Sequence, residues 1–217
     1  MLRKKIILLA FLISFVGYVN GQGQYDPQAL EILNQMSSNY NDLNSFKAEF
    51  TYVLENKMEN IQEKFAGDII IKGDKFKLDL GDQLIFNDGE TLWTYLKDVN
   101  EVNIDYYLPE DGDMTPSNIF TAYREGYKYM LLEEEKIGNH IYQIIDLVPD
   151  DVNKPFYKVK LWINKNDHTL KQWELFDKSG NTYLYDIVKF DSSYNAEDNE
   201  FLFDSNRFPG VEEIDLR

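Results

Sequence analysis

The first patterned stretch of the chain has the apolar spacing of an amphipathic helix. Asp26 followed by Pro27 is typical of a helix N-cap and the first helical residue after it. Apolar residues then recur at intervals of three and four: Ala29, Ile32, Leu33, Met36 and Tyr40. The pattern predicts a helix from Pro27 to about Leu43 that buries one face.

From Phe46 the period changes to two, which is typical of strands with one covered and one wet face. Alternating stretches follow one another, separated by Gly, Asp and Asn clusters that favour tight turns. We expect strands at residues 46–54, 65–71, 76–80, 84–86, 92–96, 99–106, 127–135, 141–148, 157–164, 170–177, 182–190 and 201–203. The connections are too short for crossover helices, so neighbouring strands are expected to be antiparallel.

One break interrupts the strands. Residues 109–116 are loop-like, and Thr115-Pro116 begins a short helical stretch that ends near Gly126. Ile119, Phe120 and Tyr123 share one side of it. The predicted fold class is therefore mainly β (α+β). It is a single curved antiparallel sheet of about 10–11 strands forming an incomplete barrel, with the N-terminal helix and a short lid helix on its concave face.

Residues 1–21 have the pattern of a cleaved signal peptide. A basic start at Arg3, Lys4 and Lys5 precedes an apolar run from Ile6 to Val16, and small residues lie at the expected cleavage site after Gly21. The run is too short for a bilayer span, which needs about 20 apolar residues. We expect residues 22–217 to form one exported domain in the periplasm.

The mature chain is strongly acidic and has no cysteine. Cleavage removes three of the 22 basic residues and none of the 38 acidic ones, so the formal charge moves from −16 to −19. Such a surface repels nucleic acid and anionic lipid head groups. Without cysteine the protein can form no disulfide and carry no lipid-modified cysteine, so we expect a soluble, freely diffusing protein.

Two aromatic residues, Trp93 and Tyr95, lie two positions apart on a predicted strand and so share a face. Two helical segments cover a long sheet poorly, and a gap between lid and wall lined by apolar side chains would hold an apolar ligand. Ordinary cross-strand packing explains the same pair. Periodicity leaves both interpretations open.

Catalytic chemistry has few candidates. The two histidines, His140 and His168, lie in predicted turns, and no Gly-x-Ser-x-Gly stretch is present. The acidic stretches at residues 110–113 and 150–151 lack the spacing of a twelve-residue calcium loop. No P-loop or dinucleotide fingerprint occurs. We expect no enzyme activity, no metal and no cofactor.

In its order of motifs the chain resembles the periplasmic outer-membrane lipoprotein carrier family, LolA. The matching stretches cover most of the mature chain: "FKAEFTYVLEN", "GDIIIKGDKFKLD", "LIFNDGETLWTYLKDVNEVNI", "TPSNIFTAYREGY", "LWINKNDHTLKQWELFDKSGNTYLYDI" and "FPGVEEIDLR". The resemblance implies a cavity for the acyl chains of triacylated lipoproteins. It also implies shuttling from an inner-membrane lipoprotein-releasing ABC transporter to the outer membrane, with an outer-membrane receptor as a further partner. We expect a monomer.

The resemblance also implies site residues. Phe76 falls at a mouth position of the family, and Lys72 falls where the family commonly has an Arg that hydrogen-bonds the lid. A lysine ammonium is a point charge, whereas an arginine guanidinium is a planar group with several donors. The contact that holds the lid closed would therefore be built differently here. The candidate cavity and lid residues are Phe50, Tyr52, Phe65, Phe76, Leu78, Trp93, Tyr95, Ile119, Phe120 and Tyr123.

Three other functions remain as alternatives. The same half-barrel occurs in periplasmic regulators that sense mislocalised lipids, although these usually carry a second domain. A glycolipid carrier would use the same cavity. A lipid-processing enzyme would need a nucleophile and a base that the sequence does not display.

Overall fold

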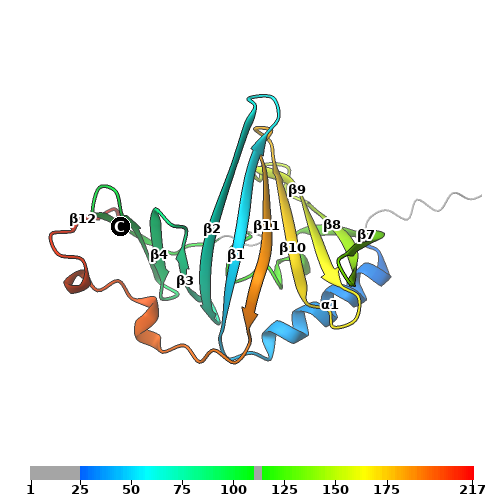
Figure 1. Ribbon diagram of the computed structural model, residues 1–217, viewed down its shortest axis with the longest axis horizontal. Helices are drawn as coiled ribbons and strands as arrows, with labels where there is room; N and C mark the ends of the chain where they lie inside the picture. The colour runs from blue at the N-terminus through cyan, green and yellow to red at the C-terminus, as the bar shows by residue number, and fades with distance from the viewer. Residues whose placement is uncertain (1–24, 110–113) are drawn as a thin grey trace, which may run out of the picture.

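The computed structural model describes residues 25–109 and 114–217, in which one α-helix covers part of an open 12-stranded sheet (Figure 1). The predicted signal peptide and the acidic stretch at residues 110–113 lie outside the described residues. The strands are β1 (Phe46–Asn56), β2 (Ile61–Lys72), β3 (Lys75–Asp79), β4 (Gln83–Asn87), β5 (Thr91–Leu96), β6 (Glu101–Tyr106), β7 (Tyr127–Ile137), β8 (His140–Pro149), β9 (Phe156–Asn164), β10 (Leu170–Asp177), β11 (Thr182–Asp191) and β12 (Glu212–Asp215).

The helix α1 (Pro27–Asn41) begins as the sequence predicts. The Asp26 carboxylate accepts hydrogen bonds from the backbone N–H groups of Gln28 and Ala29, and Pro27 occupies the first turn. These bonds satisfy N–H groups that have no partner within the helix. The apolar stripe of the helix is buried against the sheet, with Leu33 and Met36 fully covered.

The strand order is β12-β6-β5-β4-β3-β2-β1-β11-β10-β9-β8-β7, so the sheet has two free edges and is not closed. All neighbours are antiparallel except β12, which runs parallel to β6. The predicted strand at 201–203 is wrong: residues Asp198–Phe201 form a 3-10 helix, η2, and Phe201 is buried. A capping box between Glu197 and Glu200 holds this turn, and the last strand lies further along the chain.

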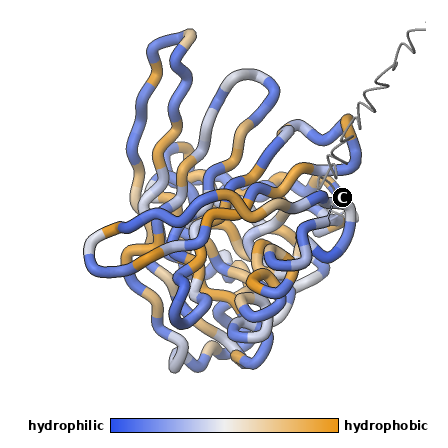
Figure 2. Tube along the Cα trace, turned by 90° about the vertical axis from the view of Figure 1, so that its right-hand side faces the viewer, coloured by the Kyte–Doolittle hydropathy of each residue, from blue (hydrophilic) through white to orange (hydrophobic). Residues whose placement is uncertain are grey.

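The two faces of the sheet are covered by different parts of the chain. Consecutive strand residues point to opposite faces. Ile71 packs in the cluster with α1, whereas the adjacent Ile70 packs against Ala196 and Phe201. We call these the helix face and the outer face. In Figure 2 the apolar stretches of the tube gather in the body of the molecule, while the tips of the projecting hairpins are mostly hydrophilic.

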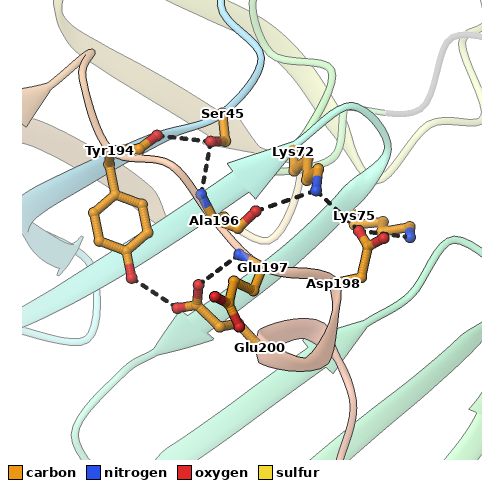
Figure 3. A network of polar contacts seen from close by, with 8 residues as sticks. All are labelled: Ser45, Lys72, Lys75, Tyr194, Ala196, Glu197, Asp198 and Glu200. Carbon is orange, nitrogen blue, oxygen red and sulfur yellow. Dashed lines mark hydrogen bonds and ion pairs between the residues drawn. The ribbon is translucent and has the colours of Figure 1, made fainter.

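Residues 192–217, here called the C-terminal segment, cross the outer face from β2 to the edge at β6 (Figure 1). Its attachment is a polar network (Figure 3). The buried Ser45 hydroxyl donates to the Tyr194 carbonyl at 2.6 Å and accepts from the Ala196 N–H at 2.9 Å. The Lys72 ammonium donates to the Ala196 carbonyl at 3.1 Å and pairs with Asp198 at 3.0 Å.

Replacing Ser45 with Ala is expected to lower the free energy of unfolding by about 1–3 kcal/mol, because it leaves the buried Ala196 N–H and the partly buried Tyr194 carbonyl without partners. Denaturant unfolding measures the change. Ser193→Ala, at an exposed hydroxyl of the same segment, is the control and should stay within about 0.5 kcal/mol of the parent. Equal stability of the two variants would show that the two hydrogen bonds of Ser45 contribute nothing measurable to the attachment of the segment.

Residues 114–126, here called the lid segment, are helical but not α-helical. Residues 116–121 form turns, and Ala122–Arg124 form a 3-10 helix, η1. The backbone bonds reach mostly three residues back, as from Thr121 to Asn118. The Thr121 hydroxyl also donates to the Asn118 carbonyl, which competes with helical bonding. So short a segment does not recover the cost of helix nucleation.

Candidate functional site

An apolar cavity of about 340 Å³ lies between the lid segment and strands β1, β2, β3, β10 and β11 on the helix face. Five of the predicted residues line it: Phe50, Tyr52, Leu78, Ile119 and Phe120. The other lining residues are apolar too, apart from Thr115 and the hydroxyl groups of tyrosines. Among the residues that the structure describes, no ionisable carboxylate, amine, guanidinium or imidazole lines the cavity. Such a wall favours a hydrocarbon ligand.

Four aromatic rings form a ladder across the helix face of β10, β11, β1 and β2. Trp173 stacks on Tyr185 with 4.7 Å between ring centroids, Tyr185 on Tyr52 at 5.5 Å, and Tyr52 on Phe65 at 4.7 Å. Each pair is directly opposed in the strand register. The interplanar angles of 8°, 24° and 18° make the rings nearly parallel. The ladder gives the cavity a flat aromatic wall that continues beyond it to Phe65.

The tyrosine hydroxyls of this wall stay protonated at neutral pH. Burial raises the pKa of Tyr185 to about 12, and the neighbouring Tyr52 and Tyr183 add to the shift. Burial likewise raises the pKa of Tyr52, with smaller effects from Asp82 and Glu63. A phenolate in this wall would lose hydration without gaining a positive partner. The cavity wall therefore carries no charge.

Raising the pH is expected to destabilise the fold between pH 10 and 12. The pKa of Tyr185 is raised in the folded protein, so its contribution is complete below pH 10 and is lost as pH rises towards about 12. Tyr185→Phe should remove up to about 3 kcal/mol of this loss of unfolding free energy. Denaturant unfolding at pH 7 and pH 11.5 tests this, with equal stability of variant and parent at pH 7 as the control. An unchanged pH slope would place Tyr185 in contact with water.

The lid segment is attached to α1 at one end and covers the cavity at the other. Near its end, the Arg124 guanidinium donates to the Ser37 hydroxyl at 2.8 Å, and the Tyr123 hydroxyl donates to the Asn34 side chain at 2.8 Å. Over the cavity the contacts are apolar. Phe120 stacks on Tyr40 with 3.7 Å between ring centroids.

Phe120 also separates the main cavity from a smaller one of about 130 Å³, which lies between the lid segment and the turn at Gly73. Both cavities have Phe46 and Ile71 in their walls. The packing of Phe120 against Tyr40 therefore closes the cavity on this side.

Gly67 on β2 allows two chain segments to approach closely beside the cavity. A Cβ atom there would lie 2.5 Å from the Asp79 carbonyl oxygen and 2.8 Å from Cζ of Phe50. The backbone oxygen has little freedom to move, so a larger residue would push β3 away from β2. The Phe50 ring lies over this glycine and forms part of the cavity wall.

The other predicted residues lie outside the cavity lining. Phe65 ends the aromatic ladder, and Phe76 is buried on the helix face with an edge contact to Tyr107. The buried Tyr123 packs towards α1.

Trp93 and Tyr95 share a face, as predicted, but it is the outer face. Tyr95 packs there against Phe203 and Phe208 of the C-terminal segment. The aromatic pair that suggested a pocket therefore belongs to the packing on the opposite side of the sheet.

Lys72 does not contact the lid segment in this structure. Its ammonium lies on the outer face and contacts Ala196 and Asp198 of the C-terminal segment, with Lys75 bound to the same carboxylate (Figure 3). The two ammonium groups lower the pKa of Asp198, so this carboxylate keeps its charge to a lower pH than an ordinary aspartate. The resemblance predicts that Lys72 holds the lid segment closed, whereas in the structure it holds the C-terminal segment against β2.

Sequence reasoning missed the part of the cavity wall that comes from β10 and β11. Its residues are Trp173, Leu175, Tyr183, Tyr185 and Ile187, with Phe190 at its end. Their alternation along each strand is visible in the sequence. The sequence does not show that these strands lie beside β1, because the pairing of β1 with β11 joins residues more than a hundred positions apart.

Other kinds of site have little support. Within residues 25–109 and 114–217, no three histidine, aspartate or glutamate side chains gather closely enough to hold a metal ion. In the same part of the chain, no helix combines the length and apolar character needed to cross a membrane. The cavity is thus the strongest candidate for a functional site.

Comparison with known proteins agrees with this geometry. Residues 41–204 match the family model described as outer membrane lipoprotein carrier protein LolA. No protein of curated function matches the chain.

Several solved structures are similar to the chain. An uncharacterized conserved protein from Thermus thermophilus is 14% identical with a TM-score of 0.57, and the match covers 87% of this chain and 99% of that one. A LolA superfamily protein from Nitrosomonas europaea is 16% identical with a TM-score of 0.45, covering 81% and 97% of the two chains. The lipoprotein LppX from Mycobacterium tuberculosis is 14% identical with a TM-score of 0.47, covering 79% and 100%.

Proposed function

The chain belongs to the family of the outer membrane lipoprotein carrier protein LolA, and from this we propose that it binds the acyl chains of lipoproteins in the cavity beneath the lid segment. The observation that carries the proposal is an uncharged, aromatic-lined cavity of about 340 Å³. A site of this size lies near the lower end of the range of about 300–1,000 Å³ for ligand pockets.

The proposed role is carriage across the periplasm, from an inner-membrane lipoprotein-releasing ABC transporter to the outer membrane or a receptor there, by a soluble monomer. The free-energy cost of exposing an acyl chain to water is large. Each buried methylene contributes about 0.8 kcal/mol, so one long acyl chain in water carries a penalty on the order of 10 kcal/mol. A carrier that covers the chain removes this penalty without any chemical step, so we propose no enzyme activity.

Loading requires the lid segment to move. A methylene group has about the volume of one water molecule in the liquid, about 30 Å³, so three 16-carbon chains need about 1,400 Å³. This is more than the cavity holds. The open and closed forms exchange, and the cargo leaves where a membrane or receptor binds the chains more strongly than the cavity does.

Native mass spectrometry and lipid extraction on the protein purified from the periplasm of its own host test the proposal. We expect one triacylated lipoprotein per chain. A chain that comes out empty, and stays empty when offered lipoprotein by its exporter, would contradict the carrier function. Co-purified glycolipid without lipoprotein would favour carriage of that lipid instead.

A further inference from the structure

Part of β2 is a free strand edge beside the cavity. β1 pairs with β2 from Ile61 to Ile71, whereas β3 pairs with it only from Asp68 to Lys72. In the described parts of the chain, no strand lies beside residues 61–67 on the side of β3. Figure 1 shows β2 rising well above β3. The outward N–H and carbonyl groups of this stretch are available for pairing with another chain.

The free edge begins at the level where the cavity wall ends. The Asp79 carbonyl lies only 2.5 Å from the position that a Cβ of Gly67 would take, so β3 ends alongside Gly67. The next residue, Leu80, lines the cavity together with Tyr52, the register partner of Phe65. A chain that leaves the cavity between Leu80 and Tyr52 therefore meets the free edge at once.

We propose that this edge binds the peptide that follows the acylated N-terminal residue of the cargo, as an added β-strand along residues 61–67. The inference rests on the proposed function, because the acyl chains in the cavity would be attached to that peptide. An added strand is held by main-chain hydrogen bonds, so it accepts peptides of differing sequence. At about 3.3 Å per residue the edge spans about 20 Å, enough for five or six residues of an extended peptide.

A second copy of this chain fits the edge less well. The full chain carries a formal charge of −16, which the expected cleavage changes to −19, and like charges oppose the close approach of two sheets. A short extended peptide does not carry so large a negative charge. Its alternate side chains would lie over Phe65, where the aromatic ladder ends.

Amide hydrogen exchange of the mature protein tests the proposal with three probes: a triacylated octapeptide, the same lipopeptide with alternate backbone nitrogens methylated, and palmitic acid. N-methylation removes backbone donors and leaves the acyl chains unchanged. We expect slowed exchange in residues 61–67 with the first probe alone, and affinity about 10- to 100-fold higher for it than for the methylated probe. The free edge of β7, the last strand of the sheet, is the internal control, and the exchange rates of its amides should stay unchanged.

Each result has a distinct meaning. Protection of the cavity strands by all three probes, with residues 61–67 unchanged, would overturn the strand-addition proposal and leave the carrier function standing. Equal protection at β2 and β7 would overturn it as well, because the pairing would not be specific to this edge. No protection of the cavity strands by any probe would overturn the proposed function, and this inference with it.

Discussion

Replacing Leu78 with Trp is expected to weaken the binding of an acyl chain by about 50-fold or more. Leu78 lies on β3 and its side chain lines the cavity. A Trp there occupies space that would otherwise hold at least three methylene groups. At about 0.8 kcal/mol for each, the loss is about 2.4 kcal/mol. Because the added ring extends into empty space, little strain on the core is expected.

The neighbouring Lys77→Trp is the matched control. Lys77 precedes Leu78 on the same strand and therefore points to the outer face, where its ammonium lies 5.5 Å from the centre of the Phe86 ring. Calorimetric titration with palmitic acid measures both variants, and thermal unfolding confirms that each is folded. If Leu78→Trp is folded and binds as tightly as Lys77→Trp, the cavity is not the acyl site.

Local structure could be predicted from the sequence because its causes are local. Asp26 and Pro27 set the start of α1 through bonds within one turn. The period of two marks strands wherever one face is buried, and Gly in a tight turn marks where a strand ends. Gly73, for example, has φ +58° between β2 and β3.

The face to which a side chain points could not be predicted in the same way. Trp93 and Tyr95 lie on a strand that is covered on its outer face by the C-terminal segment, so apolar residues there do not mark the cavity. The covering contacts join residues more than a hundred positions apart. An alternating pattern states that one face is buried and does not say by what.

Long-range pairing likewise escaped prediction. The four-residue β12 is too short to carry a pattern, and its parallel pairing with β6 follows from the path of the C-terminal segment. The contacts of Lys72 depend on the same path, because Asp198 and the Ala196 carbonyl reach it only after that segment has crossed β2. A motif match assigned Lys72 to the lid, whereas the register places it on the outer face.

Cross-linking the lid segment to the sheet is expected to lower the rate at which a triacylated lipopeptide is loaded by at least 100-fold. Ser117 of the lid segment and Gly73 of the β2–β3 turn both line the smaller cavity, so a short bis-maleimide can join cysteines placed at the two positions. The natural chain has no cysteine, so these would be its only thiols. A Cβ atom added at Gly73 meets no neighbouring atom within 4 Å, although the positive φ costs a non-glycine residue about 1 kcal/mol of stability.

The physical reason is volume. The cavity is too small for three acyl chains, so the wall must open. The apolar contacts of the lid segment are those that can separate without leaving a buried charge unpaired. A cross-linker with a cleavable disulfide provides the control, since reduction should restore loading in the same sample. The two single-cysteine variants, treated with the same reagent, should load normally. If the cross-linked protein loads at the parent rate, the chains enter by separation of the strands, and the lid segment is a fixed part of the wall.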